Sequence, residues 1–244
     1  QRPSSIPEFK HQRDRKNAKY LNIDEKTGIC DACKVNADKK KINWKEREIK
    51  LLELLDKHRS KNGDYDCIVP GSGGKDSAYA SHILKYKYGM NPLTVTWAPH
   101  MYTEIGFKNF ENWMHVGGLD NILYTPNGVL HRELTRNAFL NLLHPFQPFI
   151  IGQRIIGPSM AKKFGVKLVM YGENQAEYGN AIEENKNALM NMDFFSSDNP
   201  HELLFGGVKV EDYIKDNKYI TETLVTHKST NMSKTVVSED TIKT

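Results

Sequence analysis

The stretch "CIVPGSGGKDSAYASHILKYKYG" (67–89) passes from an apolar run into two adjacent glycines, then an aspartate and a serine, and then into a helix-like segment. Gly73 and Gly74 have no side chains, so an anion can come close to the backbone amides. The N-terminus of a following helix adds unpaired N–H groups and a partial positive charge. The hydroxyl groups of Ser72 and Ser77 can donate hydrogen bonds to the anion. The stretch therefore predicts a phosphate site between a strand and a helix.

Asp76 is the unexpected member of this loop, because a carboxylate beside a phosphate repels it unless a cation lies between them. A Mg²⁺ ion shared by Asp76 and the phosphates removes the conflict. Lys75 lies next to Asp76 in the loop, where we expect a phosphate contact but no catalytic role. The loop thus predicts phosphates bound together with magnesium.

Two common phosphate loops do not fit the spacing. A Walker A loop needs a glycine five residues before its Gly-Lys pair and Ser or Thr after it, and Val69 and Asp76 stand at those places. A dinucleotide fingerprint that starts at Gly71 needs Gly or Ala at position 76. The loop therefore belongs to another class.

Length and composition predict a soluble cytoplasmic protein with one sizeable core. The chain has 244 residues, 39% of them hydrophobic, and no run of the ~18 to 20 apolar residues that a bilayer requires. We expect further residues upstream of Gln1, because no initiator methionine opens the sequence. The net charge of +4 suits a small anionic substrate and is low for a dedicated nucleic-acid binder. Three cysteines do not make a disulfide framework.

Apolar segments alternate with helical ones along the middle of the chain, and this alternation predicts an α/β fold with a doubly wound parallel sheet. Ligands of such sheets bind outside the carboxyl ends of the strands. We expect a small N-terminal appendage over 1–43, the nucleotide domain over 44–192 and a peripheral segment over 193–244. The expected strands are 65–70, 92–99, 121–126 and 166–172; the expected helices are 44–61, the segment from the loop to Gly89, 103–116, 129–143 and 151–164, the last kinked or split at Gly157-Pro158.

The segment "SGGKDS" (72–77) resembles the PP-loop of the ATP pyrophosphatases, whose fold is adenine nucleotide alpha hydrolase-like. The resemblance implies that the loop holds the β,γ-pyrophosphate of ATP while an oxygen of the substrate attacks the α-phosphorus. An adenylated intermediate and free pyrophosphate result.

The wider chain resembles the N-acetyl sugar amidotransferases of surface-polysaccharide, lipopolysaccharide O-antigen and nonulosonate (flagellin glycan) biosynthesis. The matching stretches are "GICDAC" (28–33), "VPGSGGKDS" (69–77), "TVTWAPHMYTEIGFKNFENW" (94–113), "NGVLHRELTRNAF" (127–139) and "LVMYGENQAEYGN" (168–180). The resemblance implies that ATP and Mg²⁺ activate the acetamido group of a sugar and that ammonia converts it to an acetamidino group. It also implies a partner glutaminase with a cyclase-like subunit that supplies the ammonia. Cys67 lies within an apolar strand, where we expect a core thiol and no nucleophile.

Further site residues are expected at the carboxyl ends of the strands. After the fourth strand, Glu173 would bind Mg²⁺ or orient ammonia, and Asn174 would contact the substrate, with Glu177 as a weaker candidate; capping or surface roles are the alternative. By analogy with other PP-loop enzymes, Thr96 and the main chain near Trp97 border the adenosine. The candidates for binding the sugar or its phosphate are His100, Thr103, Asn109 and Arg154.

Cys30 and Cys33 form a CxxC knuckle that suits two ligands of a structural, tetrahedral Zn²⁺. Zinc needs four ligands, and the resemblance implies another CxxC upstream that would complete the set. A redox CxxC is the alternative, although no thioredoxin-like strand and helix surround this one.

Two other functions remain open at this point. A PP-loop enzyme that modifies tRNA would also pair CxxC with this loop, but the modest charge and the lack of a basic–aromatic stripe count against nucleic acid. A nucleotide-binding module without chemistry would have little use for Asp76 and Glu173.

Overall fold

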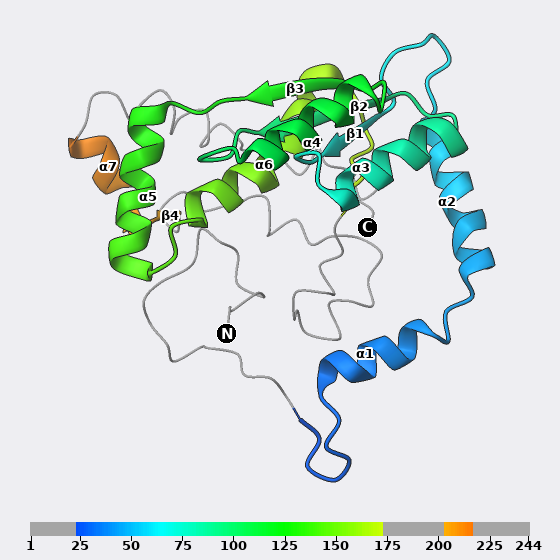
Figure 1. Cartoon of the computed structure of the whole chain (residues 1–244), viewed down its shortest axis with the longest axis horizontal. Coiled ribbons are helices and arrows are strands. Elements are labelled where there is room, and N and C mark those ends of the chain that lie inside the picture. The colour runs from blue at the N-terminus through cyan, green and yellow to red at the C-terminus, as the bar shows by residue number, and fades with distance from the viewer. Residues whose placement is uncertain (1–22, 173–202, 217–244) are drawn as a thin grey trace.

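The protein has a mixed α/β architecture around a three-stranded parallel sheet (Figure 1). The computed structural model describes residues 23–172 and 203–216. The strands β1 (Cys67–Pro70), β2 (Pro92–Trp97) and β3 (Asp120–Tyr124) lie side by side in the order β1-β2-β3. All pairs are parallel. The α/β class and the parallel sheet expected from the alternating pattern are therefore confirmed.

The expected fourth strand is reduced to one parallel bridge, between Ile68 and Val169. The amide of Ile68 donates to the carbonyl of Leu168, and the amide of Met170 donates to the carbonyl of Ile68, both at 2.8 Å. This segment pairs with β1 on the edge opposite β2. After β1 the chain forms β2 on one side of it, and later the segment at Val169 on the other side. Strand order therefore reverses at β1, and open α/β sheets bind ligands at such a topological switch.

Helices cover both faces of the sheet. On one face, α2 (Trp44–His58) and the helix after β1 bury Leu55 and Leu84 against Cys67 and Val69. On the other, α6 (Gln147–Phe164) packs Ile156 and Ala161 against Ile68 and β2. Alternate residues of β1 therefore face different helices, and both sets are apolar.

The helix after β1 consists of α3 (Lys75–His82) and a π-helical turn, η2 (Ile83–Lys87). It ends before Gly89, whose φ of +65° suits glycine, as the sequence predicted. Two further helices flank this core. α4 (Glu104–His115) packs Phe110 and Trp113 next to α3, and α5 (Gly128–Leu142) lies against α6.

Helix α6 differs from expectation in two ways. It begins at Gln147, four residues before the predicted start, because Pro148 stands in its first turn, where a missing N–H costs nothing. It also continues without a break through Gly157 and Pro158.

The described part of the C-terminal region packs into the core, although the sequence predicted a peripheral segment over 193–244. It comprises β4 (Leu204–Phe205), β5 (Val208–Lys209) and α7 (Val210–Asp216). Phe205, Val210 and Tyr213 are buried with Leu130, Leu134 and Ile151 of α5 and α6. The fully buried side chain of Gln147 fixes this hairpin: its Nε2 donates to the carbonyl of Leu204, and its Oε1 accepts from the amide of Gly206.

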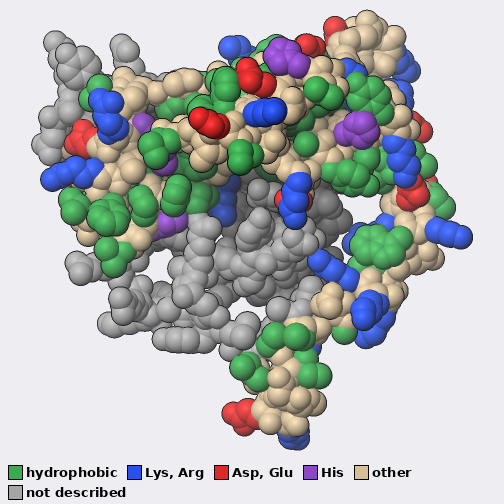
Figure 2. Space-filling model, in the orientation of Figure 1, with side chains coloured by type: hydrophobic (Ala, Val, Ile, Leu, Met, Phe, Trp, Pro, Cys, Tyr) green, Lys and Arg blue, Asp and Glu red, His purple; other side chains and the backbone are tan. Residues whose placement is uncertain are grey.

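Some apolar side chains stay exposed at the C-terminal end of α5, where Figure 2 shows hydrophobic side chains gathered at the lower left. Phe139 and Leu140 are each 54% exposed, and Leu143 is 74% exposed. No helix in the described ranges is both long and apolar enough to cross a membrane.

The N-terminal appendage is described from Ile23. Ile23 and Cys30 form an antiparallel bridge around a tight turn, in which the Asp24 side chain accepts from the amides of Lys26 and Thr27. Helix α1 (Asp31–Lys39) follows and lies apart from the sheet in Figure 1.

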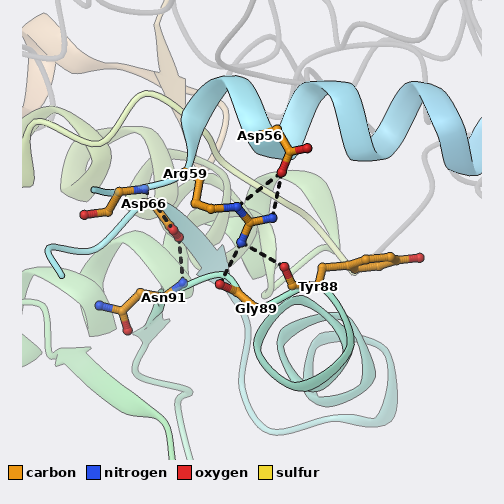
Figure 3. A network of polar contacts seen from close by, with 7 residues as sticks. Asp56, Arg59, Asp66, Tyr88, Gly89 and Asn91 are labelled. Atoms are coloured by element: carbon orange, nitrogen blue, oxygen red, sulfur yellow. Dashed lines mark hydrogen bonds and ion pairs between the residues drawn. The ribbon is translucent and has the colours of Figure 1, made fainter. Parts of the chain in front are cut away.

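An arginine joins α2 to the end of the π-helical turn (Figure 3). Nη1 of Arg59 donates to the carbonyl oxygens of Tyr88 and Gly89, at 2.8 and 2.7 Å. Asp56 holds the guanidinium group from the other side, with 2.9 Å between Nη2 and Oδ1. These bonds satisfy carbonyl groups that the end of a helix leaves without partners.

Asp66 makes a second tie at the same end of the sheet (Figure 3). It is 6% exposed, and its carboxylate accepts from the amides of Asn91 at 2.8 Å and Ser60 at 3.3 Å. The amino ends of β1 and β2 are thereby fixed to the segment that follows α2.

Replacing Arg59 by alanine is expected to lower the free energy of unfolding by about 1.5–3 kcal/mol, because two carbonyl groups lose a charged donor. The control is Lys50→Ala, which removes an exposed pair with Glu46 on the same helix and should cost less than about 1 kcal/mol. Urea unfolding curves compare the two. Equal effects of the two variants would contradict this role for Arg59.

Candidate functional site

The glycine-rich loop lies at the carboxyl end of β1 and runs directly into α3. The amide of Gly71 donates to the carbonyl of Val95 on β2 at 2.9 Å, which holds the start of the loop on the sheet. Gly74 is the N-cap residue of α3, and no side chain caps the helix there. The helix therefore starts at the ligand-binding edge of the sheet with its first amides not used by a side-chain cap.

Helix α4 supports the loop from one side. Gly73 has a φ of +80°, and a Cβ atom there would lie 2.8 Å from the Cα of Phe110. Behind it, Nε1 of Trp113 donates to Oγ of Ser81 at 2.7 Å, and that hydroxyl donates to the carbonyl of Ser77 at 2.9 Å. The conformation of the loop thus depends on direct contact with α4.

The end of the fourth segment supports the loop from the other side. A Cβ atom on Gly172 would lie 2.5 Å from the carbonyl carbon of Asp76 and 2.7 Å from the amide nitrogen of Ser77. Only a residue without a side chain can pass so close to the first turn of α3. The two strand ends at the topological switch therefore meet at this helix start.

The polar side chains of the loop fall into two groups. Ser77 is buried, and its hydroxyl donates to the carbonyl of Gly74 at 3.2 Å. Ser72, Lys75 and Asp76 are exposed, with 3.9 Å between Nζ of Lys75 and Oδ1 of Asp76. An exposed pair at this distance contributes little to stability. Lys75 and Asp76 are thus accessible to a charged ligand.

The two residues expected beside adenosine, Thr96 and Trp97, have buried side chains. Oγ1 of Thr96 accepts a hydrogen bond from Nδ2 of Asn121 at 3.0 Å. The indole of Trp97 fills the space left by Gly152, where a Cβ atom would lie 2.2 Å from the ring. A nucleotide can therefore meet these two residues only through their main chain.

The candidates for binding the sugar occupy different places. Asn109 is exposed and borders the loop. Its main-chain carbonyl oxygen would lie 3.0 Å from a Cβ atom on Gly73. Thr103 caps α4 by accepting from the amide of Gly106 at 3.0 Å. Arg154 is half-buried on α6. Of these, Asn109 lies closest to the loop by contact, and Thr103 has a structural role.

His100 belongs to an aromatic cluster that the sequence did not predict. Its ring centroid lies 4.8 Å from that of His131 on α5 and 5.4 Å from that of Phe149 on α6. Burial, followed by the proximity of His100, lowers the pKa of His131 to about 4. His131 stands one turn after the capping Asn127, and a lone histidine at that spacing carries no recognisable signal. The cluster borders the carboxyl ends of β2 and β3 through Trp97.

Three expected site residues, Glu173, Asn174 and Glu177, lie outside the described residues. Gly172 is the last described residue before them, and its contact with Asp76 places the preceding main chain at the loop.

The cysteines differ sharply in environment. Cys30 precedes α1, and Cys33 lies in its first turn, where the hydrogen-bonded Cys30 thiol raises the pKa of Cys33. The described residues bring no group of three or more His, Cys, Asp or Glu side chains together. Cys67 is buried in β1, and burial raises the pKa of its thiol well above the usual value, as expected of a core cysteine.

Comparison with known proteins adds one partial match. No family model matches the chain. It is 36% identical over 80 residues to the uncharacterized protein MJ1599 of Methanocaldococcus jannaschii. The match covers 33% of this chain and 28% of that protein, so the chain spans little more than a quarter of that relative's length.

The two adjacent glycines of the loop should respond differently to alanine. Gly73→Ala forces a strained φ and a clash with α4, and it should lower the free energy of unfolding by about 1–3 kcal/mol. Gly74 has a φ of −67°, and a Cβ atom there would meet only Oγ of Ser72 at 3.9 Å. Gly74→Ala should therefore change stability by no more than about 1 kcal/mol. Urea unfolding without ligand tests both; a larger loss for Gly74→Ala would refute the described loop geometry.

Acid should weaken the fold in part through His131. Its pKa in the folded state lies below the ordinary 6.5, so the unfolded chain takes up a proton first as the pH falls. The free energy of unfolding should then decrease between pH 6.5 and about 4, and His131→Phe should make this decrease smaller. His115→Gln, at an exposed histidine, should keep the wild-type decrease. Urea unfolding at pH 7 and pH 5 measures this decrease. An equal decrease for the wild type and His131→Phe would contradict the role of His131.

Proposed function

We propose that the protein is an ATP-dependent amidotransferase with a PP-loop, acting on the acetamido group of an N-acetyl sugar. The observation that supports this most is the place of the turn 72–76, which is exposed except at Gly73: it joins β1 to α3 at the topological switch of the sheet. Gly74 adds to the argument. Neither its φ nor its packing requires glycine, whereas a phosphate close to the backbone would.

The phosphates of ATP would lie along Ser72, Gly73, Gly74, Lys75 and Ser77, where backbone amides and one lysine supply positive potential. Asp76 is an exposed carboxylate in the first turn of the helix, which fits a Mg²⁺ ion held by one carboxylate and the phosphates. Bound there, the ion would neutralise charge on the phosphates. The main chain at Thr96 and Trp97 would border the adenosine.

The proposed reaction has two steps. The oxygen of the sugar's amide attacks the α-phosphorus of ATP, and the bond to pyrophosphate breaks. Ammonia then adds to the activated carbon, and AMP leaves with the former amide oxygen. The first step is needed because an amide oxygen is a poor leaving group until it carries a phosphoryl group. The backbone of the loop holds the departing pyrophosphate.

The substrate and partner follow from the same proposal. Asn109 borders the loop and would contact the sugar, together with His100, Arg154 and, beyond the described residues, Asn174 and Glu177. Glu173 would orient ammonia or assist Asp76. A glutaminase with a cyclase-like subunit would supply the ammonia in the cytoplasm.

The proposal includes a structural zinc site at the CxxC pair. Cys30 and Cys33 lie close enough to share a hydrogen bond, which suits two ligands of a tetrahedral ion. Zinc needs two more ligands than this pair, and the residues described here add none. No step of the reaction depends on zinc.

The reaction is tested by supplying ATP, Mg²⁺ and ammonium chloride with a panel of free and nucleotide-linked acetamido sugars. Mass spectrometry should detect replacement of one oxygen by NH, with AMP and pyrophosphate formed in equal amounts. Gly74→Ala should reduce turnover at least about tenfold, because its methyl group occupies the space of a phosphate. Asp76→Asn should reduce it by about 10²–10³-fold.

Gly128→Ala serves as the matched control, because a Cβ atom there meets nothing within 4 Å. Its activity should equal that of the wild type. Formation of ADP in place of AMP, or full activity of Gly74→Ala, would contradict the proposal.

A further inference from the structure

Helix α6 contains a proline, which cannot make one of the backbone hydrogen bonds of the helix. Pro158 lies inside the helix and has no N–H, so it cannot donate to the carbonyl of Arg154 four residues earlier. The hydroxyl of Tyr171 donates to that carbonyl oxygen instead, at 3.2 Å. A side chain from the fourth segment thus replaces one bond of the helix.

The packing around this bond is close. A Cβ atom on Gly157 would lie 3.1 Å from the Tyr171 hydroxyl and 2.5 Å from Cγ of Pro70. The missing side chain at Gly157 therefore makes room for both the phenol and the end of β1. Burial raises the pKa of Tyr171 above its ordinary value, opposed by the charge of Arg154, so the phenol stays protonated and remains a donor.

The next residue along the chain is Gly172, which contacts the peptide between Asp76 and Ser77. One peptide unit separates the tethered side chain from this contact. The planar peptide unit fixes the distance between the two Cα atoms, so the tether on Tyr171 restricts where Gly172 can lie. The first turn of α3 has no side-chain cap, so this contact is one of its supports.

We propose that Tyr171 is a positioning residue, which uses the helical carbonyl released by Pro158 to fix Gly172 against the first turn of α3. This rests on the proposed function, because that turn is the proposed phosphate site. The role is distinct from binding, because the phenol packs on the α6 side of the sheet and its hydroxyl donates to the main chain of that helix.

Three variants of the full chain separate positioning from simple stabilisation. Tyr171→Phe removes the hydroxyl and keeps the ring. Tyr65→Phe is the matched control, because it removes a phenol hydrogen bond to Asp120 at the opposite end of the sheet. The double variant Tyr171→Phe with Pro158→Ala supplies a backbone N–H for the Arg154 carbonyl but leaves residue 171 without its tether.

Hydrogen exchange of the amides at 72–78, measured without ligand, is the first readout. Exchange should become about tenfold faster in Tyr171→Phe, the effect of one hydrogen bond, and should not change in Tyr65→Phe. In the double variant fast exchange should persist, because residue 171 still lacks its tether although the Arg154 carbonyl regains a donor. Recovery of slow exchange in the double variant, or wild-type exchange in Tyr171→Phe, would overturn the proposal.

Binding of Mg–ATP, measured by calorimetry, is the second readout. The dissociation constant should rise about tenfold in Tyr171→Phe and in the double variant, and it should not rise in Tyr65→Phe. Wild-type affinity in Tyr171→Phe would overturn the link to the phosphate site. If the wild type binds no Mg–ATP, the proposed function fails, while the exchange data still decide whether Tyr171 fixes the loop.

Discussion

The structure depends on backbone contacts at the carboxyl end of β1 that leave no room for side chains. Gly73 lies against the main chain of α4, and Gly172 lies against the first turn of α3. Gly71 leaves space for Ser77, because a Cβ atom on Gly71 would lie 2.3 Å from the Cβ of Ser77. The start of α3 is therefore fixed by elements from both sides of the topological switch, before any ligand is present. Such preorganisation favours electrostatic binding, because the donors need no rearrangement.

Much of this could be predicted from the sequence, since apolar runs and glycine punctuation give the order of strands and helices. The place of "SGGKDS" between a strand and a helix was predicted, because the segment follows an apolar run. Other features depend on tertiary contacts. The π-helical turn ends where Arg59 holds the carbonyls of Tyr88 and Gly89, and no local pattern encodes that contact. The predicted start of α6 at residue 151 was too late, because Pro148 is favourable in the first turn of a helix.

The same limit applies to the candidate site. The sequence did not show that the side chains of Thr96 and Trp97 are buried, because threonine and tryptophan occur at both buried and exposed strand ends. Phe205, Val210 and Tyr213 follow no sustained helix or strand period, so their packing on α5 and α6 was not predicted. His131 required the fold to bring it within 4.8 Å of His100. The bond from Tyr171 to Arg154 needed both the proline and the folded sheet.

The two ends of the parallel sheet thus differ in role. The amino ends of β1 and β2, tied through Arg59 and Asp66, provide stability. The carboxyl ends provide an exposed turn with Lys75 and Asp76 accessible and with Asn109 beside it. The proposed chemistry needs little more from this turn than firm binding of two phosphates, which leaves the α-phosphorus open to an amide oxygen.

The most direct test of the central claim is an NMR titration of the ¹⁵N-labelled protein with Mg–pyrophosphate, followed by Mg–ATP. The account predicts that both ligands produce their largest saturable amide shifts over residues 72–77, and that ATP adds shifts near Trp97. Saturable shifts located elsewhere, or none within 72–77, would contradict it.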